Sequence, residues 1–418
     1  MRYFFILGLH PALSFAEISA VLADNRFEIK DLLEAAIVIE TEKELDLPAL
    51  MRRLGGTIKA GRIIDGPAKL TDDEVLAKAA DHLLTAHGDD SRPVFGFSAY
   101  TALGVEGVRS LAKKIIVRGM ETKKILREQD RASRWVRPQT GLTLSSVVVT
   151  KNKLIEEGAE FVVLIDRNSL VSLAVTEAVQ PFEEFSRADY GRPARDTHQG
   201  MLPPKLARMM INLAGVGTDA VIIDPFCGSG TVLTEAIQMG FQDVVGSDLN
   251  PTAVKSTEQN ITWLKEHGSA PKTVRLFASD ARHIGQHLEP ASIDAVVAET
   301  FLGSPRHGRE KRSELQKTLS DLSRLYYESL GAWRRLLKPG AAVVLALPVY
   351  VLGPERHGLK ADEFVKLGYA IEPLLKSDAL VKLDVKETKN RGLVYGRADQ
   401  LVWREIIRLR WNGDPAAK

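Results

Sequence analysis

Two patterns of hydrophobic positions divide the chain. Up to about residue 180, short apolar runs and helical periodicity are mixed irregularly, which is typical of an α+β fold. From residue 201 onward, apolar runs alternate with helical stretches, which predicts a mostly parallel sheet covered by helices. We expect strands of that sheet at residues 220–223, 243–246, 274–278, 293–298 and 341–347, with closing strands at 379–385 and 401–409.

The first region contains several recognisable elements. At its start one arginine precedes a short apolar stretch, as in a signal peptide, but Ser14 and Glu17 have the spacing of a capping box. We therefore expect a strand and then an amphipathic helix there. The turn residues at 166–169 predict a hairpin of two strands at residues 160–165 and 170–176. Further helices are expected at residues 46–54 and 72–87, and further strands at 38–39, 94–97 and 145–150.

Periodicity is lost between residues 180 and 200, which predicts a linker. The expected organisation is a small α+β N-terminal domain at residues 1–58, a second α+β domain at 59–180, a linker at 181–200 and a Rossmann-like α/β domain at 201–418. The expected fold class is thus α/β, with α+β modules in front of it.

Composition places the chain among soluble globular proteins. Of 418 residues, 44% are hydrophobic and 26% are charged, which excludes a collagen, a disordered chain and a disulfide scaffold. No apolar run approaches the roughly 18 residues of a membrane-spanning helix, so we expect no membrane contact. The single cysteine, Cys227, and the nine histidines show no metal-ligand spacing, so we expect a cytoplasmic protein without a metal.

Charge is distributed unevenly, although the net charge is only +2. Residues 106–137 hold ten Lys or Arg against four Asp or Glu, which indicates either a solvated helix face or a surface that follows phosphates. A second basic stretch at residues 304–312 is either a solvated loop or a loop that binds RNA phosphates. The candidate phosphate contacts are Arg109, Lys113, Lys114, Lys123, Lys124, Arg127, Arg306 and Arg309.

The most informative stretch is Val221-Ile-Ile-Asp-Pro-Phe-Cys-Gly-Ser-Gly-Thr231, which leads into a helix at 232–239. In a doubly wound sheet, ligands lie beyond the carboxyl ends of the strands, where a Gly-rich turn and a helix N-terminus meet them. Asp248 and Asp280 follow the next two strands. The dinucleotide fingerprint G-x-G-x-x-G is absent, and an acid that opens the turn is unfavourable beside a pyrophosphate.

Three acids at successive strand ends suit a cationic cofactor. S-adenosylmethionine carries an amine and a sulfonium, and its ribose diol can donate hydrogen bonds to a carboxylate. Taken singly, Gly228 and Gly230 could form a helix-entry turn and each aspartate a solvated cap, whereas together and in order they favour a cofactor site. A nucleophilic role for Cys227 is disfavoured, because it lies in this turn and no partner base is evident.

The stretch Asp224-Pro-Phe-Cys-Gly-Ser-Gly-Thr231, with Leu202-Pro-Pro-Lys-Leu-Ala-Arg208 before it, resembles the THUMP-containing tRNA guanosine N2-methyltransferases that act on the D-arm guanosine and their archaeal-type relatives. The resemblance spans most of the chain. It implies a THUMP-like RNA-binding domain at 59–180, a class I methyltransferase domain at 201–418, S-adenosylmethionine as cofactor, and tRNA as substrate and partner. It also implies that Asp224, Gly228 and Gly230 line the methionine end, Asp248 the ribose and Asp280 the adenine, with Phe226, Thr231, Leu249 and Ala281 beside them.

The chain departs from this family where the target base should lie. After the fourth strand the family carries Asp-Pro-Pro, an aromatic and Gly, whereas this chain reads Glu299-Thr-Phe-Leu-Gly303. An exocyclic guanine amine is a poor nucleophile until acceptors take hydrogen bonds from its two protons. We expect the Glu299 carboxylate and the Thr300 carbonyl to be these acceptors and Phe301 to be a stacking face. The alternatives are a solvated carboxylate and a core aromatic.

Three other functions remain open from the sequence. An N6-adenine methyltransferase on DNA or RNA also uses an acid-initiated loop, and an RNA-binding protein could keep cofactor affinity without turnover. A nicotinamide-dependent dehydrogenase is disfavoured by the glycine spacing. We expect a monomer, and the sequence leaves open whether a small activator protein binds and whether one or two methyl groups are added.

Overall fold

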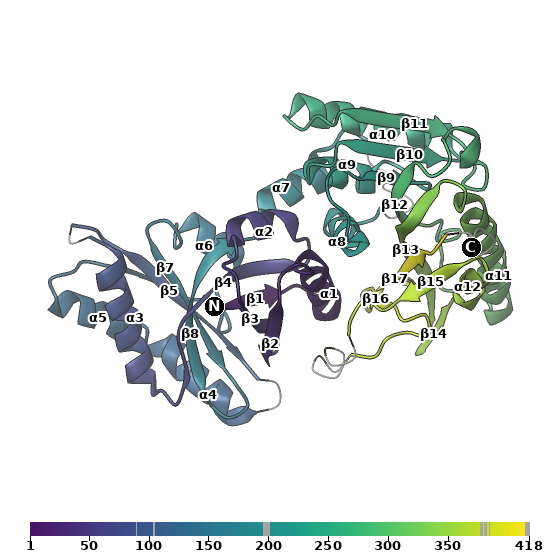
Figure 1. The fold of residues 1–418 in the computed structure, drawn as a ribbon. Helices are drawn as coiled ribbons and strands as arrows, with labels where there is room; N and C mark the ends of the chain where they lie inside the picture. Colours follow the sequence, from purple (N-terminus) through teal and green to yellow (C-terminus); the bar gives the residue numbers. More distant parts are fainter. Residues whose placement is uncertain are drawn as a thin grey trace. The chain divides into compact units, whose positions relative to one another are not determined.

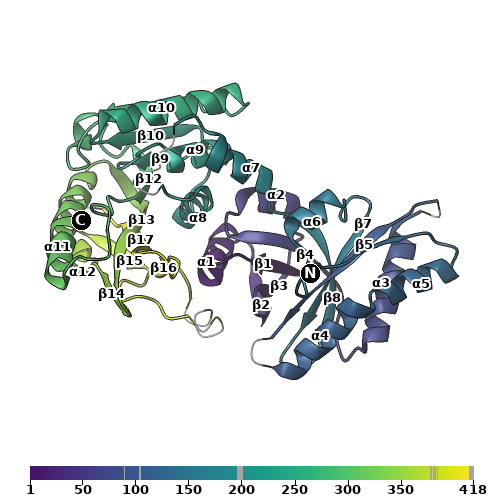
Figure 2. The same ribbon diagram turned by 180° about the vertical axis from the view of Figure 1, so that it is seen from behind.

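In the computed structural model the chain divides into two units, and residues 1–88, 90–102, 105–194, 201–376, 379, 383 and 385–413 are described. The first unit holds Met1–Pro11 and Leu22–Phe182, and the second holds Ala12–Val21 and Glu183–Lys418. Each unit is built on one sheet, as Figures 1 and 2 show from opposite sides.

The first unit contains an eight-stranded sheet. Its strands are β1 (Arg2–Leu7), β2 (Phe27–Leu32), β3 (Ala36–Thr41), β4 (Thr57–Ala68), β5 (Val94–Thr101), β6 (Arg134–Val136), β7 (Gly158–Ile165) and β8 (Val171–Val179). Its helices are α2 (Leu47–Arg53), α3 (Asp72–Ala86), α4 (Glu106–Arg118), α5 (Met120–Glu128) and α6 (Ser146–Lys151). The strand order is β2-β3-β1-β4-β8-β7-β5-β6, and the antiparallel pairing of β7 with β8 confirms the expected hairpin. The domain boundary expected after residue 58 falls inside β4, so one sheet spans both expected α+β modules.

The second unit contains the other sheet and most of the remaining helices. Its strands are β9 (Val221–Asp224), β10 (Asp243–Asp248), β11 (Thr273–Ala278), β12 (Ile293–Glu299), β13 (Leu337–Leu352), β14 (Glu355–Gly358), β15 (Tyr369–Glu372), β16 (Leu393–Tyr395) and β17 (Val402–Trp411). Its helices are α1 (Pro11–Val21), α7 (Phe182–Ser186), a π-helix (Arg187–Gly191), α8 (Pro204–Ala214), α9 (Thr231–Gln238), α10 (Pro251–Glu266), a 3₁₀-helix (Ile284–Gln286), α11 (Arg312–Trp333) and α12 (Asp362–Lys366).

The topology of the second sheet confirms the alternating pattern read from the sequence. Its strand order is β11-β10-β9-β12-β13-β17-β15, with parallel pairing from β11 to β13 and an antiparallel β17. Figures 1 and 2 show α8 and α11 on either side of β12 and β13. The chain order reverses between β9 and β12, and the carboxyl ends of parallel strands that flank such a switch point form the usual ligand crevice.

Two local expectations in these units are wrong. Residues 145–150 form helix α6 instead of a strand, because the Ser145 side chain caps the helix by accepting from Val148 N. Ser14 and Glu17 lie inside α1 and do not cap its start, because the helix already begins at Pro11, a residue that suits a first turn. Glu17 is buried and accepts a hydrogen bond from Asn212 Nδ2 at 2.7 Å.

The expected linker is partly helical, since α7 and the π-helix occupy residues 182–191, while residues 195–200 lie outside the described part. Most of the strand expected at 379–385 also lies outside it, and Ala379 and Leu383 within that run are helical. The strand expected at 401–409 is confirmed as β17. Among the described helices, none combines the length and the apolar character needed to span a bilayer.

Candidate active site

The turn between β9 and α9 is shaped by two glycines in left-handed conformations. Gly228 has φ 53° and Gly230 has φ 84°. A Cβ on Gly230 would lie 2.8 Å from Thr257 Cγ2, and the Thr257 hydroxyl is fixed by donating to the Gly228 carbonyl at 2.8 Å. A Cβ on Gly228 would meet nothing closer than the Phe226 carbonyl at 4.0 Å, so open space borders the backbone there.

Asp224 lies at the centre of a cluster of acids. It is 2% exposed, and its Oδ1 accepts from Phe226 N at 2.9 Å. Burial raises the pKa of Asp224 well above its usual value, and the negative charges of Asp248 and Glu299 raise it further. The structure therefore brings together the ends of β9, β10 and β12 in a buried, electronegative site.

The end of β10 combines an acid with an exposed apolar side chain. Asp248 accepts from Gly228 N at 3.0 Å with Oδ2 and from Asn250 N at 2.8 Å with Oδ1. These bonds tie the β10 end to the Gly-rich turn. The next residue, Leu249, is 72% exposed and offers an apolar surface beside the carboxylate.

The third aspartate already has a cationic partner. Arg282 donates to Asp280 Oδ2 at 2.7 Å and to Oδ1 at 3.0 Å, and this hydrogen bonding lowers the pKa of Asp280 to about 2. The Ala281 carbonyl accepts from Trp333 Nε1 at 2.8 Å. Asp280 is therefore ionised and held in place after β11, but it shares its charge with Arg282.

Glu299 ends β12 at the switch point and pairs with Arg404 of β17. The pair joins Arg404 Nε to Glu299 Oε1, and no described residue donates to Oε2. Burial raises the pKa of Glu299, while the charge and hydrogen bond of Arg404 lower it. The carboxylate is thus oriented by one oxygen and has the other available as an acceptor.

The Thr300 carbonyl is left without a donor by a proline on the neighbouring strand. Glu299 pairs with Ala346 in the parallel ladder, and Thr300 N donates to the Ala346 carbonyl at 3.3 Å. The next donor in this ladder would be the N–H of residue 348, which is a proline. No described residue replaces that donor, so a second acceptor lies next to Glu299.

The rest of the loop is fixed through its backbone. The Tyr326 hydroxyl donates to the Phe301 carbonyl, and the Tyr350 hydroxyl donates to the Leu302 carbonyl at 2.8 Å. Phe301 itself is 49% exposed, so its ring is not part of the core. A stacking role for Phe301 stays a prediction.

Comparison with known proteins relates this site to methyltransferases. Residues 192–337 match a family described as "RMKL-like, methyltransferase domain", and residues 112–259 match one described as "DNA methylase". The tRNA (guanine(10)-N2)-dimethyltransferase of Methanothermobacter thermautotrophicus is 34% identical over 176 residues, which make up 42% of this chain and 46% of that protein. The tRNA (guanine(6)-N2)-methyltransferase of Thermus thermophilus is 30% identical over 154 residues, 35% of this chain and 39% of that protein.

The sequence similarity of this chain to tRNA guanosine N2-methyltransferases is therefore limited to part of its length. The matched stretches span less than half the length of these curated relatives. The crystal structure of TrmN from Thermus thermophilus, 15% identical, superposes with a TM-score of 0.53 and covers 98% of this chain and 100% of that one. This likeness concerns the fold, and it supports the mixed α/β architecture with a class I methyltransferase sheet.

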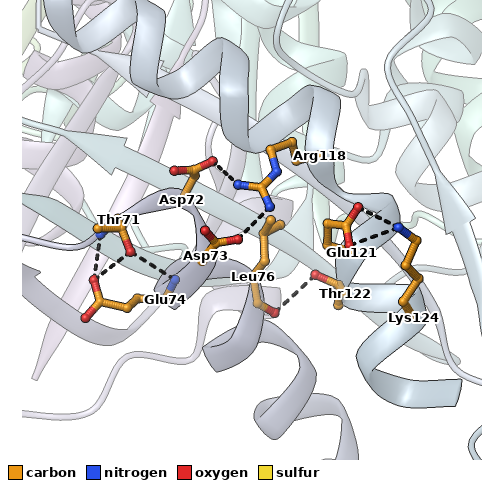
Figure 3. Close-up of polar contacts among 9 residues, drawn as sticks. All are labelled: Thr71, Asp72, Asp73, Glu74, Leu76, Arg118, Glu121, Thr122 and Lys124. Carbon is orange, nitrogen blue, oxygen red and sulfur yellow. Dashed lines mark hydrogen bonds and ion pairs between the residues drawn. The ribbon is translucent and has the colours of Figure 1, made fainter. Parts of the chain in front are cut away.

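Most of the basic side chains expected to contact RNA are exposed on α4 and α5. Arg109, Lys113, Lys114 and Arg127 are exposed, Lys123 is half-buried, and none of these five has a hydrogen bond or ion pair within the described residues. Two other cations of these helices, unlike those five, have acidic partners, as Figure 3 shows. Arg118 donates to Asp72 and Asp73 at 2.5 and 2.6 Å, and Lys124 donates to Glu121 at 2.9 Å. Fewer basic side chains are therefore available to bind phosphates than the ten Lys and Arg residues at 106–137 suggest.

In the second basic stretch, Arg306 forms hydrogen bonds with backbone carbonyls of this protein. Its guanidinium donates to the Leu401 carbonyl at 2.7 Å and to the Val351 carbonyl at 2.9 Å, and its side chain is 4% exposed. It also lies 5.2 Å from the Tyr350 ring centroid. Arg306 is thus occupied by protein groups, whereas Arg309 is exposed and remains a candidate contact.

Sequence reasoning missed Arg404 and the role of Pro348. A signal existed for both, because the adjacent charged residues Arg404 and Glu405 precede the apolar residues Ile406 and Ile407 within one expected strand, and a proline interrupts the longest apolar run. Cys227 is buried, and burial raises the pKa of its thiol, which agrees with the expectation that it is no nucleophile. Among the described residues, no group of three or more His, Cys, Asp or Glu is placed to hold a metal ion.

Proposed function

We propose that this protein transfers a methyl group from S-adenosylmethionine to the exocyclic N2 amine of a guanosine in tRNA. The observation that supports this most strongly is the juxtaposition of a buried acid cluster around Asp224 with two hydrogen-bond acceptors, Glu299 and the Thr300 carbonyl, at one switch point. The curated relatives are named for action on guanine N2 of tRNA, which favours this reaction over N6-adenine methylation.

The residues at the switch point fit such a cofactor. Asp224 is buried among like charges, and no described residue pairs with it as a cation, so an ammonium or sulfonium would supply the missing positive charge. Gly228 leaves open space next to the backbone. We assign Asp224, Phe226, Gly228, Gly230 and Thr231 to the methionine end. The ribose and adenine would be held by Asp248, Leu249, Asp280 and Ala281.

The bound cofactor would supply an electrophilic methyl group. The Oε2 atom of Glu299 and the Thr300 carbonyl would each accept a hydrogen bond from the guanine amine, which localises the nitrogen lone pair. The amine nitrogen would take the methyl group from the sulfonium, which would leave as a neutral thioether, and Glu299 would accept the proton lost from nitrogen. The Phe301 ring would stack on the base, which must leave its helix first.

Assay of the purified protein tests this function directly. We expect that incubation with methyl-labelled S-adenosylmethionine and unmodified tRNA gives N2-methylguanosine after digestion to nucleosides. Label in adenosine would select the N6-adenine reaction instead. Cofactor binding by calorimetry with no labelled nucleoside in any tRNA would favour an RNA-binding protein without turnover.

We further propose that the unpaired cations of α4 and α5 hold the tRNA in a THUMP-like module at residues 59–180. Changing Lys113 and Lys114 to alanine together is expected to weaken tRNA binding and to lower the slope of log affinity against log salt by about 0.7 to 0.9 for each lost phosphate contact. Lys124→Ala is the matched comparison and should change the slope less, because Glu121 already neutralises Lys124. Equal effects of both changes on the slope would contradict this assignment.

Replacing Pro348 by alanine should lower turnover through the backbone alone. Alanine restores an N–H opposite the Thr300 carbonyl, and a hydrogen bond worth about 1 kcal/mol would then compete with the guanine amine. We expect kcat to fall about fivefold with the KM for tRNA unchanged. Pro290→Ala, in an exposed turn, is the control and should behave like the wild type. An unchanged kcat in Pro348→Ala would remove the Thr300 carbonyl from the mechanism.

A further inference from the structure

The Glu299–Arg404 pair spans three strands of the second sheet. Glu299 on β12 pairs with Ala346 on β13, and Ala346 pairs with Ile406 on β17. Arg404 lies two residues from Ile406 and therefore on the same face of β17. By register Arg404 lies opposite Pro348 of β13, and its side chain crosses this strand to reach the Glu299 carboxylate.

Both members of the pair are largely withdrawn from solvent. The Arg404 side chain is 8% exposed and that of Glu299 is 19% exposed. A buried arginine needs a partner for its charge, so the pair has a defined geometry and little freedom to exchange with water. The contact uses Nε of Arg404 and a single carboxylate oxygen, and the other oxygen of Glu299 has no donor among the described residues.

Few other ionisable groups face Glu299. Asp224 on β9 interacts with it as a like charge, and Tyr326 on α11 interacts with it through a phenol whose own pKa is raised by burial. Ala346 and Pro348, the nearest residues of β13 by register, carry no titratable side chain. Arg404 is thus the one cation among these groups. Its charge lowers the pKa of Glu299, whereas burial and the negative charge of Asp224 favour the protonated form.

We propose that Arg404 is a positioning residue for the methyl transfer, which keeps Glu299 ionised and fixes the orientation of its free oxygen toward the target amine. This inference rests on the proposed function and assigns a role to a residue outside the motifs of the active-site loop. A chain with glutamate in place of the aspartate of the family pattern has a longer and more flexible acid, and Arg404 removes that freedom.

Two substitutions of Arg404 separate charge from geometry. Arg404→Gln removes the charge, so the pKa of Glu299 should rise further and the acid limb of the pH–kcat profile should move to higher pH. We expect kcat to fall about 10- to 100-fold, with the KM for tRNA and the affinity for S-adenosylmethionine within about threefold of the wild type. Arg404→Lys should restore the acid limb and recover part of kcat, because it keeps the charge without the planar donor.

Arg410→Gln provides a matched control on the same strand. Arg410 pairs with Glu372 at 3.0 Å near the other end of β17, so its loss should leave the pH profile in place. Thermal unfolding of each variant will show whether the fold is kept. If Arg404→Gln does not fold, Arg404→Lys still tests the proposal through kcat, which must fall while the acid limb stays at its wild-type position.

A second readout does not depend on activity. Carbon-13 labelling of glutamate δ-carboxyl groups allows the titration of Glu299 to be followed by NMR, with the signal assigned by its absence in Glu299→Gln. A higher pKa of Glu299 in Arg404→Gln supports the proposal, and an unchanged pKa overturns it. If the wild type methylates no tRNA, the proposed function fails. In that case, the NMR titration still decides whether Arg404 controls the ionisation of Glu299.

Discussion

Replacing Glu299 by glutamine is expected to lower kcat by about 100-fold or more, while the affinity for S-adenosylmethionine stays within about threefold of the wild type. Glutamine keeps an oxygen near the target amine but loses the negative charge that accepts its proton, and positioned acid–base groups contribute about 10²- to 10⁴-fold. Single-turnover methyl transfer to tRNA measures the effect on chemistry, and calorimetry measures cofactor binding.

The controls for this change must address the partner left behind. Glu299→Gln deprives Arg404 of its ion pair, and an unpaired buried charge can destabilise a protein by about 3 to 5 kcal/mol. Glu299→Asp keeps the charge with a shorter side chain and should retain more activity than glutamine. Glu355→Gln, an exposed glutamate of β14, should change neither kcat nor stability appreciably. Wild-type kcat in a folded Glu299→Gln variant would refute the acceptor role.

Asp224→Asn is expected to weaken S-adenosylmethionine binding by about 10- to 100-fold. Asparagine can still accept from Phe226 N, so the turn should keep its shape, but the charge that complements a cationic ligand is lost. Because Asp224 is buried among like charges, its replacement should leave the melting temperature unchanged or raise it. Asp243→Asn at the opposite end of β10 is the control and should bind the cofactor normally.

The affinity for S-adenosylmethionine should also depend on pH in a defined direction. The pKa of Asp224 is raised, so the group takes up a proton at a pH where a solvated aspartate is still ionised. Wild-type affinity for the cationic cofactor should therefore fall as the pH is lowered through that pKa, by at most about tenfold per pH unit for one proton. Asp224→Asn should abolish this dependence, and the same slope in the variant would assign it to another group.

The fold class and the turn could be predicted from the sequence because both depend on local order. Alternating apolar runs and helices specify a parallel sheet, and consecutive parallel strands place their carboxyl ends at one edge. This is why Asp224, Asp248 and Asp280 could be expected at one edge of the sheet. In the structure, Asp248 and Glu299 are the acids that interact with Asp224, while Asp280 pairs with Arg282. The strand expected at 145–150 was wrong because the local cap of Ser145 starts helix α6, whereas Glu17 is engaged by a tertiary contact, since it bonds to Asn212 of α8.

The sequence by itself determined the parallel sheet of the second unit, the glycine turn and the acids that follow the strands, since each is specified by neighbours in the chain. The single sheet of the first unit was decided by tertiary pairing, because β4 pairs with β1 and β8 across the expected domain boundary. Tertiary structure alone decided which atoms of the active-site loop are available. Strand register places the nitrogen of Pro348, which carries no proton, at the ladder position that would donate to the Thr300 carbonyl, and it brings Arg404 to Glu299 across 105 residues. The same folding withdraws Arg306 into the loop. These outcomes depend on pairing between distant strands, which residue spacing along one strand does not encode.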